Sequence, residues 1–123
     1  MSDTNTPWGY ADTVRPIAPG ITWYSTSSHG GIGLSAERLT AMPTALRSIH
    51  PWAGEGWYEE DCDWSIAVAA FAELFTAREL HYAARTLPNI SYAKSAVAEF
   101  MATSAGQTFN RLAAVWQPST SEL

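Results

Sequence analysis

Residues 27–31, Ser-Ser-His-Gly-Gly, combine a titratable imidazole with small and hydroxyl side chains. Gly30 and Gly31 admit backbone angles that are closed to other residues, so a tight turn can form directly after His29. Such a turn can point consecutive N–H groups at an anion, and the Ser28 hydroxyl can add a donor. The imidazole has an unperturbed pKa of about 6.5, which suits a general acid or base. The alternative is a plain hairpin in which His29 forms only local hydrogen bonds.

Residues 56–64, Gly-Trp-Tyr-Glu-Glu-Asp-Cys-Asp-Trp, gather four carboxylates where an apolar helical pattern begins. The helix macrodipole stabilises each carboxylate there by ~0.3–1 kcal/mol, which explains their position without any function. Crowded carboxylates also repel one another, and a group whose pKa rises becomes an acid–base candidate or a ligand for a hard cation. On a helix that starts near Glu60, the side chains of Glu60 and Asp63 share one face, whereas Asp61 points elsewhere.

The two stretches together define a candidate site. As a catalytic site, it would use His29 with Glu60 and Asp61, provided that these groups meet within direct contact or one bridging water. As a binding site, it would use Ser28, Gly30, Gly31, Trp57, Tyr58 and Glu59. Cys62 is a poor candidate nucleophile because the flanking carboxylates oppose thiolate formation.

Other residue types give weaker indications. His50 and His81 do not have the spacing of zinc ligands, so we expect no metal site, and we expect no cofactor. Some of the six tryptophans could stack on a base or a sugar, although core packing is the favoured explanation for each one singly. The four considered for stacking are Trp8, Trp23, Trp52 and Trp57.

The elements that must position these residues follow from patterning. Turn signals at residues 18–20 and 29–31 divide residues 13–34 into two or three antiparallel strands. Helices are expected after Ser35, from near Glu60 through residue 75, after a Thr76–Glu79 capping box and after Ser91, with Gly106 interrupting the last helical stretch. The predicted fold class is α+β, a small N-terminal antiparallel β-meander packed on a C-terminal layer of three to four helices.

Composition limits the class of protein. The 123 residues suit one domain, which we place at residues 7–116, between a flexible arm at 1–6 and a polar tail at 117–123. A net charge of −5 argues against independent binding of nucleic acid. The single cysteine allows no internal disulfide, no apolar run spans a membrane, and the polar N-terminus does not resemble a signal peptide. We therefore expect a soluble, cytoplasmic protein with no membrane partner.

Several motifs together resemble an uncharacterised domain family found in phage, plasmid and proteobacterial proteins. The family pattern is W-G, then P-G-I, then T-x-S-H-G-G, then W-Y-E-E-D before a helix. In this chain the matching stretches are Thr6–Gly9, Ala18–Ser35, Met42–Pro43 and Gly56–Trp64. The resemblance covers about residues 6–75, and it places signature positions at His29, Gly30, Gly31, Glu59, Glu60 and Asp61. It implies a mobile-element context, in which small acidic proteins often counter host defences.

Two functional hypotheses follow. The favoured one is an interaction protein that inhibits a host defence system, as an anti-CRISPR or anti-restriction protein. It would act in the host cytoplasm by binding a host protein or defence complex. The surplus of Trp and Tyr residues suits such a binding face. The alternative is a small hydrolase or transferase that uses His29 with a carboxylate of residues 59–61. Binding of a small ligand and a purely structural role stay open beside them. Both main hypotheses require His29 and the acidic cluster to meet on one accessible surface.

Overall fold

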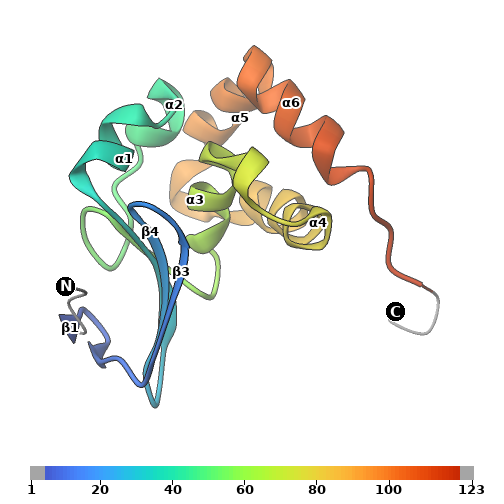
Figure 1. Cartoon of the computed structure of the whole chain (residues 1–123). Coiled ribbons are helices and arrows are strands. Elements are labelled where there is room, and N and C mark those ends of the chain that lie inside the picture. Colours follow the sequence, from blue (N-terminus) through green and yellow to red (C-terminus); the bar gives the residue numbers. More distant parts are fainter. Residues whose placement is uncertain (1–4, 120–123) are drawn as a thin grey trace.

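The computed structural model describes residues 5–119 and shows the predicted α+β layout (Figure 1). Its main sheet is four-stranded and antiparallel, in the order β3-β4-β5-β6. These strands are β3 (Thr13–Ala18), β4 (Ile21–Ser25), β5 (Gly30–Leu34) and β6 (Trp57–Glu59). A small separate hairpin joins β1 (Asn5–Thr6) to β2 (Gly9–Tyr10). Part of the predicted arm is therefore paired, and its first four residues lie outside the described residues.

Helices cover one side of the sheet. Helix α3 packs directly against β5 and β6; α4 and α6 pack against α3, and α5 packs against α2 and α6 (Figure 1). The α-helices are α1 (Ala36–Ala41), α2 (Thr44–Arg47), α3 (Trp64–Ala70), α4 (Ala77–Thr86), α5 (Lys94–Ala102) and α6 (Ser104–Ala113), with single 3₁₀ turns η1 (Ala72–Leu74), η2 (Leu87–Asn89) and η3 (Ser91–Ala93). The predicted Ser35 cap and the Thr76–Glu79 capping box are both confirmed. Among residues 5–119, every helix falls short of the length and hydrophobicity that a membrane-spanning helix requires.

Strand alternation gives the sheet two different faces. Ile21, Ile32 and Tyr58 point toward the helices and are at most 1% exposed. The strand register places Tyr24 opposite Gly31, and Gly31 opposite Glu59, on the other face. We call this second surface the outer face of the sheet.

Glycines let aromatic rings lie against the outer face. A Cβ on Gly31 would come within 2.7 Å of the Trp8 ring, and one on Gly33 within 2.9 Å of the rings of Trp57 and Tyr24. Trp8 and Trp57 meet edge to face with ring centroids 5.8 Å apart. The N-terminal hairpin, which carries Trp8, therefore packs on the side of the sheet opposite α3 (Figure 1).

The helix predicted to start near Glu60 was placed wrongly. Residues 57–59 form β6, a turn follows, and α3 begins only at Trp64. The cause is a long-range interaction, because β6 completes the sheet by pairing with β5. The spacing of apolar residues within one segment cannot reveal this pairing. The predicted apolar stripe is also broken at Phe71, where the backbone leaves the helical region with φ −129° and ψ 48°.

Two details of the C-terminal helices also differ from the prediction. Helices α5 and α6 are separated at Thr103, which caps α6, and Gly106 lies inside α6. A Cβ on Gly106 would fall 2.1 Å from the Phe100 carbonyl oxygen, so this glycine allows close helix contact instead of breaking the helix. Ser91 begins a 3₁₀ turn, and α5 starts only at Lys94. Residues 117–119 of the predicted polar tail have no regular secondary structure.

Candidate functional site

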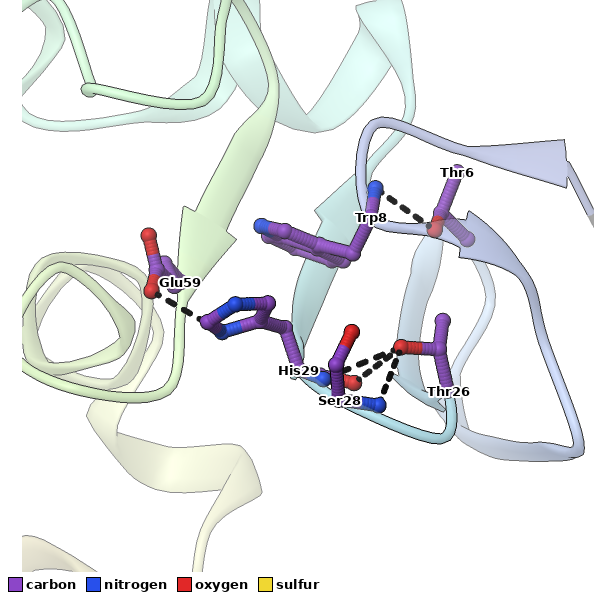
Figure 2. Close-up of polar contacts among 6 residues, drawn as sticks. All are labelled: Thr6, Trp8, Thr26, Ser28, His29 and Glu59. Carbon is purple, nitrogen blue, oxygen red and sulfur yellow. Dashed lines mark hydrogen bonds and ion pairs between the residues drawn. The ribbon is translucent and has the colours of Figure 1, made fainter.

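His29 and Glu59 meet on the outer face of the sheet. His29 directly precedes β5, and Glu59 ends β6 opposite Gly31. Their side chains point toward each other, with Nδ1 of His29 3.6 Å from Oε1 of Glu59 (Figure 2). The His29 side chain is 52% exposed and that of Glu59 16% exposed. The imidazole therefore meets the acidic stretch as the sequence suggested, but through Glu59 and not through Glu60.

The turn before His29 is held by Thr26. Its Oγ1 accepts the N–H of Ser28 at 3.3 Å and the N–H of His29 at 3.0 Å, and its hydroxyl donates to the His29 carbonyl at 2.8 Å (Figure 2). These bonds occupy the N–H groups of Ser28 and His29, so neither group is available to an anion. The local hairpin thus accounts for Ser28, and the loop positions the imidazole without presenting its amides to a ligand.

Gly30 and Gly31 serve close packing, since the described residues with positive φ are other glycines. A Cβ on Gly30 would lie 2.6 Å from the Tyr24 carbonyl oxygen, and one on Gly31 would lie 2.3 Å from the Tyr58 carbonyl oxygen. The prediction of a tight turn directly after His29 was therefore wrong, because Gly30 and Gly31 belong to β5, although both residues border the site.

A cleft of about 640 Å³ opens beside the His29–Glu59 pair. We call it the Glu59 cleft. It is lined by Pro7, Trp8, His29, Trp52, Glu59, Asp61, Cys62, Asp63 and Tyr92. Three carboxylates and three large aromatic side chains thus face one space, and among the described residues neither Lys nor Arg lines it.

Asp63 anchors one wall of the Glu59 cleft. It is 4% exposed, and it accepts the backbone N–H of Trp52 at 3.0 Å and the hydroxyl of Tyr92. Trp52 and Tyr92 are nevertheless 82% and 52% exposed. A buried carboxylate therefore holds two aromatic residues, from the loop before β6 and from η3, at the rim of the cleft.

The electrostatics of the cleft are dominated by uncompensated negative charge. Partial burial raises the pKa of Glu59 above its usual value, and the neighbouring Asp61 carboxyl raises it further, by its charge and by a hydrogen bond. The proximity of His29 lowers this pKa in part. Burial and the bond to Asp63 raise the pKa of the Tyr92 hydroxyl, so it stays a donor at neutral pH.

The remaining predicted site residues lie elsewhere or play packing roles. Tyr58 faces the core, where its hydroxyl contacts the Met42 sulfur and burial raises its pKa to about 12, so it takes no part in the cleft. Trp57 packs between Tyr24 and Trp8 on the outer face. Glu60 is exposed beside Gly30 and does not line the cleft, whereas Asp61 does.

Tyr92 was not among the residues predicted from the sequence, and Trp52 was predicted only as one of four tryptophans that either stack on a ligand or pack in the core. Tyr92 lies 29 residues from Asp63, in a segment with no motif, so no local signal could have linked the two. Within residues 5–119, no three His, Cys, Asp or Glu side chains are arranged to hold a metal ion.

Glu59→Gln is expected to stabilise the protein at neutral pH. A raised folded-state pKa means that the carboxyl contributes stability below its unfolded pKa and loses it as the pH rises through the folded pKa. The neutral amide removes this cost, so the free energy of unfolding should rise by up to roughly 1 kcal/mol near pH 7. The gain should vanish below about pH 4, where glutamate is protonated in both states.

Urea unfolding at both pH values measures this difference. The exposed neighbour Glu60→Gln is the matched control and should change stability by less than about 0.5 kcal/mol. A loss of stability in Glu59→Gln at pH 7 would show that attraction to His29 outweighs burial and the charge of Asp61.

Comparison with known proteins gives one match. No curated protein and no solved structure matches the chain. A family model described as "Domain of unknown function (DUF7007)" matches residues 1–117, nearly the whole chain. The expected membership of an uncharacterised domain family is thereby confirmed. The chain belongs to the DUF7007 family, whose members share this domain of unknown function.

Proposed function

We propose that the chain is an interaction protein that binds a protein partner through the Glu59 cleft. The observation that carries this proposal is Trp52, which is 82% exposed although its backbone is fixed by the buried carboxylate of Asp63. Burying a large apolar side chain contributes about 1.5–3 kcal/mol, so a tryptophan held in water is a ready anchor for a partner.

The composition of the cleft supports the same function. Trp and Tyr are enriched at the centres of interfaces, where they fill space at little cost in side-chain entropy. Asp63 binds both the Trp52 backbone N–H and the Tyr92 hydroxyl at the rim. These bonds already restrict the two residues, so they lose less conformational freedom when a partner binds. The shared bonds to Asp63 also distinguish these two residues from aromatic residues that have no such anchor.

We further propose that the partner is a component of a host defence system, such as a CRISPR or restriction complex, which the chain inhibits by covering a surface. The support for this step is the resemblance of the His29 and Glu59 motifs to those of phage and plasmid proteins, together with the small size and the net charge of −5. A basic working surface on the partner suits this charge.

Trp52→Ala is expected to weaken partner capture. Wild-type and variant baits are immobilised and exposed to lysate from a bacterium that carries CRISPR and restriction systems, and retained proteins are quantified by mass spectrometry. Loss of an interface anchor of this kind lowers affinity roughly tenfold or more.

The matched control for this experiment is Val115→Ala, which removes an apolar side chain that is 74% exposed and follows α6. It should retain the same proteins as the wild type. Equal retention by the wild-type and Trp52→Ala baits, or retention of nothing by either, would contradict the proposal.

A second candidate function is supported by the His29–Glu59 contact itself. Glu59 has the raised pKa of an acid–base group and lies 3.6 Å from an imidazole nitrogen, so the pair could share proton transfer in a hydrolase or transferase. Purified protein is assayed on activated ester and phosphodiester substrates. Activity that falls about 100-fold in both His29→Gln and Glu59→Gln would favour the enzyme, whereas activity unchanged in both variants would exclude it.

A further inference from the structure

We infer that the Glu59 cleft recognises an arginine side chain of its protein partner. This inference rests on the proposed function and names the chemistry by which the cleft would select its partner.

The first support is the charge balance of the cleft. Glu59 is 16% exposed and Asp63 4% exposed, and Asp61 stands at the mouth. The only basic side chain on the lining, within the described part of the chain, is His29. An incoming cation would therefore meet the neighbouring carboxyls of Glu59 and Asp61, and it would relieve their mutual repulsion.

The second support is the aromatic wall around these carboxylates. Trp8, Trp52 and Tyr92 line the same space as Glu59 and Asp61. Figure 2 shows the Trp8 ring extending over His29, with its indole nitrogen on the side where Glu59 lies. The Trp8 edge that points toward Glu59 is electropositive, so the aromatic faces open to a cation in the cleft are those of the exposed rings of Trp52 and Tyr92. Attraction between the cation and these rings adds to the charge pairing.

The third support distinguishes arginine from lysine. The guanidinium is planar and weakly hydrated, so it can stack on an indole while two of its N–H groups bind a carboxylate, whereas the compact ammonium stays strongly hydrated. This chain already pairs arginine with aromatic rings: Arg38 lies 5.1 Å from the ring centre of Phe71, and Arg78 lies 5.3 Å from that of Trp116. The Glu59 cleft also presents aromatic rings, and within the described residues no arginine of this chain lines it.

The test is a titration followed by NMR. Protein labelled with ¹⁵N is titrated at constant ionic strength with the peptide acetyl-Gly-Arg-Gly-amide, and with peptides in which citrulline or lysine replaces arginine. Citrulline keeps the shape of the side chain but has no charge. The resonances followed are the indole of Trp52 and the backbone amides of Glu59 and Asp61.

The arginine peptide should shift these resonances saturably, with a Kd in roughly the millimolar range expected for a single side chain. The citrulline and lysine peptides should each bind the wild type at least about tenfold more weakly than the arginine peptide does. The arginine peptide should lose affinity by a similar factor on the double variant Glu59→Gln/Asp61→Asn. Glu99→Gln, which neutralises an exposed carboxylate on α5 outside the cleft, should bind like the wild type.

The inference is overturned if the arginine peptide gives no saturable shift, if citrulline or lysine binds as tightly as arginine, or if the double variant binds like the wild type. These outcomes leave the proposed function separately testable. A protein captured in a Trp52-dependent manner, without arginine binding, would keep the interface and remove only its arginine chemistry.

Discussion

Replacement of Gly31 by alanine is expected to destabilise the protein by about 3 kcal/mol or more, because the new methyl group has no space. Its Cβ would lie 2.3 Å from the Tyr58 carbonyl oxygen and 2.7 Å from the Trp8 ring. The first contact is with backbone, so relief requires β5 and β6 to separate or the strand to shift. Since Glu59 ends β6, the same movement would carry its carboxylate away from His29.

Urea unfolding measures the loss in Gly31→Ala, and the distance between β5 and β6 can be followed by nuclear Overhauser effects between residues 31 and 59. Ser27→Ala, an exposed change in the preceding loop, is the control and should cost less than about 0.5 kcal/mol. A cost below about 1 kcal/mol for Gly31→Ala would contradict the close approach of Gly31 to the Tyr58 carbonyl and to the Trp8 ring.

Asp63→Ala is expected to cost about 2–4 kcal/mol and to release the aromatic rim of the cleft. The carboxylate accepts two hydrogen bonds, from the Trp52 N–H and the Tyr92 hydroxyl, and it is 4% exposed. Its removal leaves the Trp52 N–H without its acceptor and leaves a space beside α3. Trp52 and Tyr92 should then lose their fixed positions.

A double-mutant cycle separates these effects. Asp63→Asn and Tyr92→Phe are measured singly and together by urea unfolding, and we expect a coupling energy of about 1 kcal/mol or more, as for residues in one hydrogen-bond network. Asp61→Asn, which changes an exposed carboxylate in the same turn, should instead leave stability within about 0.5 kcal/mol of the wild type. A coupling near zero would show that Asp63 and Tyr92 act independently.

Local sequence patterns could not decide whether Glu59 or Glu60 lies beside His29. Treated as the start of a helix, residues 59–63 place Glu60 beside Asp63; as the end of a strand, they place Glu59 beside His29. A three-residue strand has too little sequence of its own to be distinguished from a helix start. Only its pairing with β5 decides, and that pairing joins segments about 26 residues apart.

Predictions that depended on neighbouring residues were more accurate. The Ser35 cap and the Thr76–Glu79 capping box involve side chains within one turn of the backbone that they bind, and both are present. The division of residues 13–34 into strands follows from turn residues and alternation, and it is also correct. The aromatic rim could not be predicted in this way, because Trp52, Asp63 and Tyr92 come from three separate elements.

The Glu59 cleft combines features that a purely structural role does not require. Three of these features lower the stability of the fold: the raised pKa of Glu59, the exposed Trp52 and the clustered carboxylates. Such losses of stability are typical of residues that serve binding or catalysis. The expected gain in stability of Glu59→Gln and the expected loss of partner capture in Trp52→Ala are two consequences of this one arrangement.

Hydrogen–deuterium exchange of the chain, alone and in complex with a captured partner, tests the central claim most directly. If the Glu59 cleft is the interface, exchange should slow at residues 7–8, 26–31, 50–63 and 91–93, the segments that form the cleft and its rim. Protection confined to α4 and α6, with exchange at residues 50–63 unchanged, would place the interface elsewhere and contradict the account.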